Sequence, residues 1–215
     1  MKNYLSLSDH VYNFIVEQIN NGTLIPDKKV NENAICEALK VSRTPVREAL
    51  IQLSSEGLLE NIPRRGFVIK SLTTEEAKET YYIIGALDGL ACSLTAPLLT
   101  DVQLKEMEFY IDSIDLAINT GNFSMYHKMA EEFHDVYLSI CPNQSLVTLL
   151  LQLQKKFLKT FDWIEDLDWI TEKLTETNNE HRIMLDLFKK QKTAELEVFM
   201  KEVHWDVRKA ELLPL

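Results

Sequence analysis

The chain has 215 residues, of which 46% are hydrophobic and 26% charged, so it is long enough for one or two globular domains. Because it holds only six glycines and six prolines, collagen-like, low-complexity and largely disordered chains are excluded. The net charge of −10 is uneven: residues 1–72 hold nine basic and eight acidic residues, whereas residues 73–215 hold 14 and 25, so any nucleic acid should bind the first third of the chain.

The first third of the chain predicts three short helices. Apolar residues with helical spacing occupy positions 11–19, and a second helix is expected over residues 32–39. A tight turn then leads to Ser42, a suitable N-cap, and to Pro45, which fits the first turn of a third helix because its missing N–H is not needed there. Gly57 should end that helix.

Two short β-prone segments follow, at residues 58–62 and 67–69. The residues between them, Pro-Arg-Arg-Gly at 63–66, are typical of a hairpin turn. A winged helix-turn-helix has this order of elements: three helices, the last two joined by a tight turn, and then a hairpin. We therefore assign residues 1–72 to such a DNA-binding domain.

Beyond residue 72 the strand patterns stop and every segment follows the helical period. Capping-box pairs at Thr73 with Glu76 and at Thr100 with Gln103 mark two helix starts. Further helices are expected over residues 124–140, 144–163, 168–188 and 193–212. Short connections make neighbouring helices antiparallel, which predicts an all-α bundle of about six helices over residues 73–215 and a mainly α fold class.

The start of the third helix carries the side chains best suited to reading DNA. Arg43 and Arg47 lie four residues apart and therefore project from one face. Two guanidinium groups there could enter a major groove and bond guanine O6 and N7, although on spacing alone two solvated arginines near Glu48 are an equal interpretation. The hairpin favours the first interpretation, because Arg64 and Arg65 put two more cations on a tip that could reach an adjacent minor groove.

These motifs resemble those of the GntR family of bacterial transcription regulators. The matching residues are Gly22, Leu24 and Pro26, VSRTPVREAL at 41–50, Glu56 to Leu58, and RRGFV at 64–68. The resemblance implies that the third helix lies in the major groove and the wing in the minor groove. It assigns to DNA the residues Arg43, Thr44, Arg47, Arg65 and Gly66, to which we add their neighbour Arg64. Where the fatty-acid-responsive member has another arginine in the second helix, this chain has Asn33.

Four of the five histidines lie beyond residue 72, and three of these share an apolar helical context. They are His134, His181 and His204, one on each of three predicted helices. A single histidine on a helix is more often structural than a ligand, but three converging neutral imidazoles suit Zn²⁺ or Ni²⁺. The fourth, His127, lies seven residues before His134 and could line the same cavity or lie on the surface.

This second region resembles the FCD-type effector domain that accompanies such winged helices. By that resemblance the three histidines occupy the family's metal positions, and the carboxylate ligand of the family falls on Ala130 in this chain. Glu131, one position on, or water is the expected replacement. The family also holds an effector carboxylate with an arginine four residues before an acidic residue of the first helix, but four residues before Asp88 this chain has Ile84.

The predicted function is that of a ligand-responsive transcription regulator, with a repressor favoured, that binds a palindromic DNA operator as a homodimer. A symmetric pair doubles the few base contacts of one small domain. A small-molecule effector bound in the bundle would shift the relative placement of the two DNA-binding domains.

Two other classes of function remain open at this point. A metal-dependent enzyme could use the three histidines, but no activated nucleophile, phosphate loop or HExxH motif accompanies them, so we expect no enzyme. A structural metal-binding module with an incidental basic wing is the other alternative.

Cysteine usage and hydropathy predict a cytoplasmic protein with no membrane partner. Cys36, Cys92 and Cys141 occur singly, which favours buried thiols over disulfides or a zinc knuckle. The apolar run at 146–151 is far shorter than the roughly 20 residues of a membrane helix. Trp163, Trp169 and the leucines of that run are read as core or dimer surface.

Overall fold

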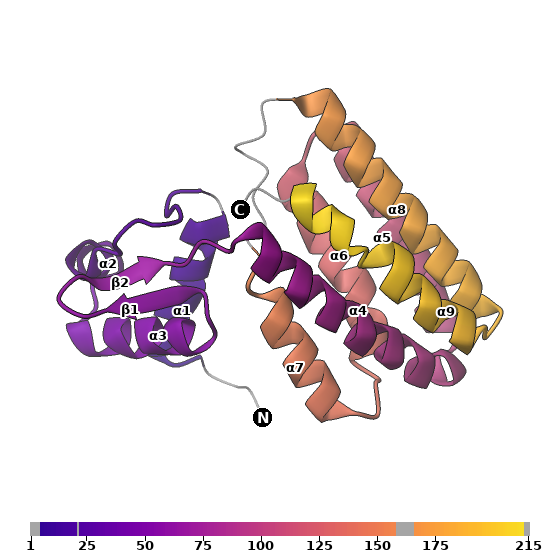
Figure 1. The fold of residues 1–215 in the computed structure, drawn as a ribbon, viewed down its shortest axis with the longest axis horizontal. Coiled ribbons are helices and arrows are strands. Elements are labelled where there is room, and N and C mark those ends of the chain that lie inside the picture. Colours follow the sequence, from indigo (N-terminus) through magenta and orange to yellow (C-terminus); the bar gives the residue numbers. More distant parts are fainter. Residues whose placement is uncertain (1–4, 21, 158–165, 213–215) are drawn as a thin grey trace. The chain divides into compact units, whose positions relative to one another are not determined.

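The computed structural model describes residues 5–20, 22–157 and 166–212, and these residues form two compact units (Figure 1). The main boundary between the units falls between Thr73 and Thr74.

The first unit consists of three helices and a two-stranded hairpin. Its elements are α1 (Leu7–Asn20), α2 (Glu32–Leu39), α3 (Arg43–Ser55), β1 (Leu59–Ile62) and β2 (Gly66–Ile69). The strands are antiparallel, with Leu59 opposite Ile69 and Ile62 opposite Gly66. This order confirms the predicted winged helix-turn-helix fold.

Local sequence features explain where the helices of the first unit begin. Asn31 caps α2, because its side-chain oxygen accepts hydrogen bonds from the backbone N–H groups of Asn33 and Ala34. Ser42 is the N-cap residue of α3, as predicted, although its side chain makes no capping hydrogen bond. Lys40 closes α2 in the left-handed conformation, with φ of 54°, and so turns the chain sharply into α3.

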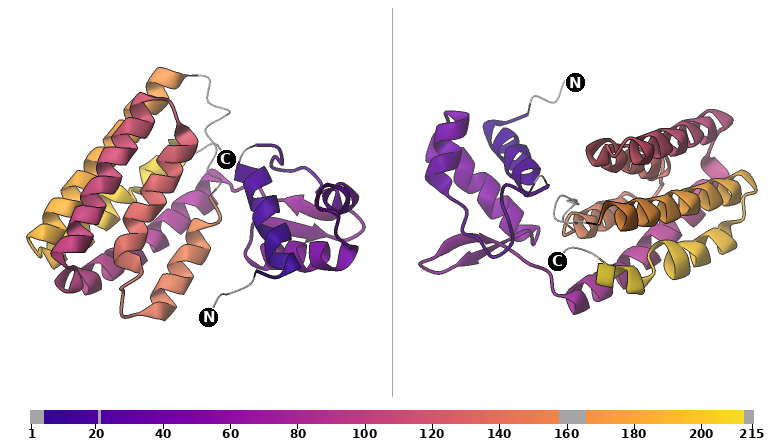
Figure 2. Two further views of the ribbon diagram at one scale, coloured as in Figure 1. Left: turned by 180° about the vertical axis from the view of Figure 1, so that it is seen from behind. Right: turned by 90° about the horizontal axis from the view of Figure 1, so that it is seen from above.

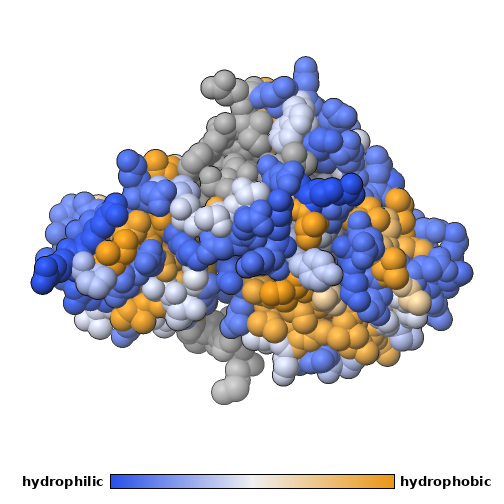
Figure 3. Space-filling model, viewed as in Figure 1, coloured by the Kyte–Doolittle hydropathy of each residue, from blue (hydrophilic) through white to orange (hydrophobic). Residues whose placement is uncertain are grey.

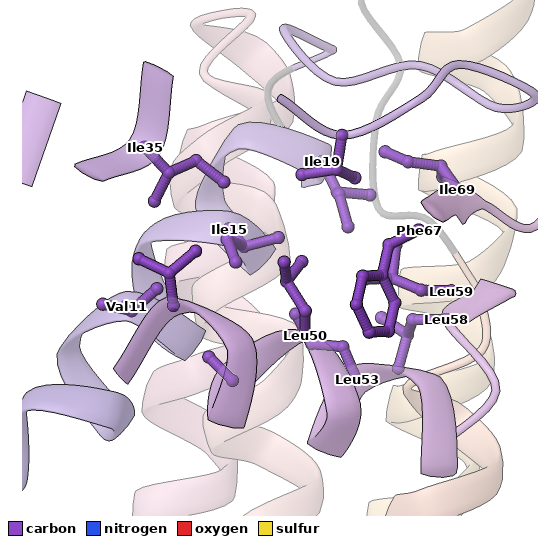
Figure 4. Packing of buried hydrophobic residues seen from close by; sticks show 13 residues of the cluster. Val11, Ile15, Ile19, Ile35, Leu50, Leu53, Leu58, Leu59, Phe67 and Ile69 are labelled. Carbon is purple, nitrogen blue, oxygen red and sulfur yellow. The ribbon is translucent and has the colours of Figure 1, made fainter. Parts of the chain in front are cut away.

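The core of the first unit draws side chains from all three helices and both strands (Figure 4). Its labelled members are Val11, Ile15, Ile19, Ile35, Leu50, Leu53, Leu58, Leu59, Phe67 and Ile69. Burying one such large aliphatic or aromatic side chain contributes about 1.5–3 kcal/mol. Because one face of α3 is buried in this core, the opposite face of the helix is exposed to solvent.

The second unit is all-α, as predicted. Its helices are α4 (Thr74–Thr95), α5 (Asp101–Asn119), α6 (Phe123–Leu138), α7 (Gln144–Gln154), α8 (Leu167–Lys189) and α9 (Thr193–Phe199). Figure 2 shows them lying side by side, and α5 packs on both α6 and α8 while α4 packs on α9. The predicted capping box of Thr100 and Gln103 begins α5.

Two predicted helices end earlier than their periodicity indicates. Helix α7 stops at Gln154 rather than Trp163, and residues 158–163 of that prediction lie outside the described residues. The predicted helix over 193–212 is interrupted, because a π-helical turn at Met200–His204 follows α9 and a 3₁₀ segment occupies Val207–Leu212. The wider π turn brings both Met200 and His204 into the interior, a deviation often found at functional sites.

Helix α4 lets the C-terminal segment approach closely. A Cβ atom on Gly89 would lie 2.9 Å from the carbonyl oxygen of Glu197, and one on Gly85 would lie 3.1 Å from the Cβ of Trp205. At Gly89 any side chain would force the two backbones apart, and at Gly85 it would require a small shift of its neighbours. The stretch Thr74–Leu98 is also long and apolar enough to cross a membrane, but half of it is buried inside the protein, which is typical of a core helix.

Candidate nucleic-acid interface and candidate metal centre

The exposed face of α3 presents the predicted recognition residues. Arg43, Thr44 and Arg47 are all exposed, whereas the opposite face of the helix is buried through Pro45, Val46, Ala49, Leu50 and Leu53. The helix N-terminus therefore points two guanidinium groups and a hydroxyl outward from a rigid core. Such a surface has the donors needed for guanine edges and phosphates.

Helix α2 holds both arginines of α3. The Nη2 atom of Arg43 donates a hydrogen bond to Asn33 Oδ1 at 3.1 Å, and Nε of Arg47 donates to Glu32 Oε2 at 3.1 Å. The Arg47 side chain is 67% exposed, so this ion pair contributes about 0–1 kcal/mol and DNA can displace it. Sequence spacing suggested Glu48 as the partner and missed Glu32, which comes close only when α2 packs on α3.

The hairpin carries the other predicted cations at its tip. Arg64 and Arg65 are exposed in the turn, which is closed by a hydrogen bond from the backbone N–H of Arg65 to the carbonyl oxygen of Ile62 at 3.0 Å. Gly66 adopts φ of 88°, a left-handed conformation that favours glycine. Arg65 also donates to the backbone carbonyl of Asp27 at 3.3 Å.

The second unit brings the three predicted metal ligands together from three elements. His134 lies on α6, His181 on α8 and His204 in the π turn, and one ligand atom of each lies within 4.8 Å of the others. Their ring centroids are 5.2–5.3 Å apart. The group includes neither His127 nor Glu131.

Glu131 is exposed, although the sequence suggested it as a fourth ligand. One residue turns a helix by about 100°, so a carboxylate at position 131 leaves the face on which Ala130 and His134 lie. Ala130 brings no ligand atom of its own. Within the described residues, the protein ligands that converge are thus the three imidazoles.

Burial keeps the three imidazoles neutral. It lowers the pKa of His134, and it lowers the pKa values of His181 and His204 well below the usual histidine value. For His181 the proximity of the other two rings adds to the effect. Neutral imidazole is the form that binds a metal ion.

Each ring uses its Nδ1 atom for a hydrogen bond to a different partner. His204 Nδ1 lies 2.9 Å from Glu180 Oε2, and His181 Nδ1 lies 3.2 Å from Asn178 Oδ1. His134 Nδ1 lies 2.8 Å from the hydroxyl of Tyr137. The Nε2 atoms are thereby left for a common ligand.

The partners of His181 and His204 fix which nitrogen carries the proton. A carboxylate only accepts, so His204 must donate from Nδ1 to Glu180. The amide nitrogen of Asn178 already donates to the carbonyl of Ile111 at 3.0 Å and to Asp115 at 2.7 Å, so its oxygen faces His181 and accepts from Nδ1.

The residues fit a divalent ion. The Nε2 atom of His181 is buried and has no hydrogen-bond partner, which is costly unless a cation occupies the space in front of it. Sequence analysis missed Asn178, Glu180 and Tyr137. Asn178 and Tyr137 each lie three residues from the histidine they contact, a spacing at which helix side chains meet. Glu180 contacts His204, 24 positions away, and no local spacing indicates that pair.

A winged helix-turn-helix unit joined to a helical bundle with a buried histidine centre defines a two-domain regulatory architecture. Comparison with known families agrees with it: residues 7–69 match the family described as bacterial regulatory proteins, gntR family, and residues 79–204 match the FCD domain. The chain belongs to the GntR family and carries an FCD domain, as the sequence motifs predict.

Several transcription regulators are similar to this chain. The uncharacterized HTH-type transcriptional regulator YdhC of Bacillus subtilis is 32% identical over 65% of the chain, and the match spans 62% of that relative. A probable D-xylose utilization operon transcriptional repressor of Paenarthrobacter nicotinovorans is 36% identical over 66% of the chain and 62% of its own length. The structure of E. coli McbR/YncC shares the fold, with a TM-score of 0.82 at 20% identity over 97% of this chain and 99% of that one.

Proposed function

We propose that this chain is a cytoplasmic, DNA-binding transcription regulator that acts as a homodimer on a palindromic operator and responds to a small effector. The observation that carries the proposal is the outward face of α3, where Arg43 and Arg47 stand on a helix fixed by the core. The similarity to a probable repressor favours repression. The family's description as regulatory proteins supports a role without catalysis.

Selection from random duplex DNA, followed by binding assays at several salt concentrations, tests DNA recognition. A dimer that contacts several phosphates should give a steep negative slope of log K against log salt and a two-fold symmetric preferred sequence. A chain that enriches no sequence, or whose binding is insensitive to salt, would not be an operator-binding regulator.

The outer face of α4 supports the dimer. Tyr82, Ile83 and Leu90 are 75%, 47% and 40% exposed along this helix, and Figure 3 shows hydrophobic surface over α4 and α7. Soluble monomers rarely expose a large continuous apolar patch, and a two-fold axis would cover the same patch on both copies.

An Ile83→Glu variant tests this surface. A charge buried twice in a symmetric interface should convert the dimer to a monomer in sedimentation at micromolar concentration. The control is Val198→Glu, because Val198 is an exposed apolar residue on another helix of the same unit. A dimer that survives Ile83→Glu would place the interface elsewhere.

The metal part of the proposal assigns a Zn²⁺ or Ni²⁺ ion to the Nε2 atoms of His134, His181 and His204. Such an ion would offer a coordination position to water or to an oxygen atom of the effector. The position that holds a carboxylate-binding arginine in the family is the buried Ile84, so this chain has no cation there for an effector carboxylate. The effector is therefore proposed to bind through the metal.

A further inference from the structure

A continuous chain of hydrogen bonds leads from the histidine centre to a buried carboxylate. His134 Nδ1 lies 2.8 Å from the Tyr137 hydroxyl, which donates to Asp88 Oδ1 at 2.7 Å. The other carboxylate oxygen, Oδ2, accepts from the indole Nε1 of Trp205 at 2.8 Å. Asp88 and Tyr137 are completely buried, so water does not substitute for any of these contacts.

The chemistry of Trp205 and Asp88 sets the direction of the hydrogen bonds in this series. The Trp205 indole can only donate, and both Asp88 oxygens accept, Oδ1 from the Tyr137 hydroxyl and Oδ2 from the indole. The hydroxyl hydrogen of Tyr137 therefore points to Asp88, and its oxygen accepts from Nδ1–H of His134. The lone pair of His134 is then on Nε2, the atom that faces the other two histidines.

Neighbouring groups do not alter this assignment of the His134 proton to Nδ1. The Cys92 thiol also interacts with the Tyr137 hydroxyl, but sulfur accepts hydrogen bonds much more weakly than a carboxylate does. Glu180 and Asn178 fix the other two rings independently of Asp88. The relay through Tyr137 thus controls one ligand of the three.

We propose that Asp88 is a positioning residue of the metal centre: acting through Tyr137, it holds His134 in the tautomer that can bind a metal ion, and Trp205 fixes the orientation of the Asp88 side chain. The inference rests on the metal site proposed above. Asp88 places a buried carboxyl group near a centre in which Ala130 provides none. It also links one metal ligand to α4 and to the segment after the π turn.

Replacing Asp88 by asparagine reverses the relay without changing the size of the side chain. Because Trp205 can only donate, the amide oxygen must face the indole and the amide NH₂ must face Tyr137. The tyrosine oxygen then accepts, its hydrogen turns to Nδ1 of His134, and the histidine proton moves to Nε2. A protonated Nε2 does not bind metal.

The first measurement is the affinity for Zn²⁺ or Co²⁺ in competition with a chromophoric chelator. Asp88→Asn should weaken binding about 10–100-fold, the range typical for loss of an outer partner of a ligand. Trp205→Phe alone leaves Asp88 bonded to Tyr137, so its affinity should stay close to that of the wild type.

The double variant Asp88→Asn with Trp205→Phe separates a positioning role from a structural one. Without the indole N–H the amide is free to turn its oxygen toward Tyr137, which restores the wild-type tautomer. Metal affinity should recover to nearly that of Trp205→Phe. A merely structural role predicts the opposite, namely that the double variant binds at least as weakly as Asp88→Asn, and that result would overturn the inference.

The metal-free protein provides a second, independent measurement. Imidazole ¹⁵N NMR should report a proton on Nδ1 of His134 in the wild type, on Nε2 in Asp88→Asn, and on Nδ1 again in the double variant. If the wild type binds no divalent ion, the proposed metal site fails, whereas unchanged ¹⁵N tautomers in Asp88→Asn contradict the relay itself.

Discussion

The two units hold their functional side chains in opposite ways. In the first unit, Arg43 and Arg47 project into solvent and each is held by one exposed contact to α2. In the second, three histidines are packed in the interior, and each Nδ1 atom has a specific partner. The arginine face of α3 is therefore ready to exchange partners, because its contacts are weak, whereas the histidine centre is preorganised for one kind of ligand.

The largest effect is expected when one imidazole is removed from the histidine centre. His181→Ala should lower affinity for Zn²⁺ by more than about 100-fold, the upper end of what loss of an outer partner costs, because a direct ligand is lost. The matched control is His127→Ala, a histidine outside the group of three. The measurement is the metal content of each protein, purified from cells grown in metal-sufficient medium.

Equal metal content in the wild type, His181→Ala and His127→Ala would show that the centre is a polar pocket. In that case the preorganisation seen in the second unit serves effector binding alone, and the DNA-binding part of the proposal stands unchanged.

The proposed DNA-binding face of α3 should respond more moderately to substitution, since the free energy of binding would be divided among several side chains. Arg47→Ala should weaken operator binding by about 1–3 kcal/mol and flatten sequence preference at one symmetric pair of positions. Arg208→Ala is the control, because Arg208 is an equally charged, 82% exposed arginine of the second unit. An unchanged affinity of a folded Arg47→Ala dimer at the same salt concentration would remove Arg47 from the interface.

The difference between the units also explains what the sequence could predict. The helices and hairpin of the first unit follow from local features such as the Asn31 cap and the turn before Gly66, so their order and the exposed arginines could be read directly. The histidine centre depends on contacts between distant segments. Trp205 and Asp88 are 117 positions apart, and no local sequence pattern predicts that such a pair forms a hydrogen bond.

The predicted unbroken helix over residues 193–212 is wrong for the same physical reason. Apolar spacing continues through Leu196, Met200 and Val203, which predicts an unbroken last helix, whereas close packing on the α4 glycines accompanies a π turn. Glu131 stays a prediction: it adjoins Ala130 in sequence, but it is exposed and lies outside the group of three histidines, since neighbours along a helix point in different directions. The three histidines could be named in advance, and their partners could not.

The smallest predicted effect concerns the contact between α2 and α3, and it tests whether the first unit is indeed ready to exchange partners. Glu32 holds Arg47 through a hydrogen bond of 3.1 Å and places a negative charge beside the recognition helix. Glu32→Gln should weaken the contact with Arg47 and remove that charge, so DNA affinity should rise, by no more than about five-fold because an exposed ion pair is worth at most about 1 kcal/mol. Fluorescence anisotropy with the selected operator measures the change, and Glu60→Gln, at an exposed residue of the wing, is the control for the loss of one negative charge. A fall in affinity would mean that Glu32 orients Arg47 for the base it reads, and the DNA surface would then be preorganised in the same sense as the histidine centre.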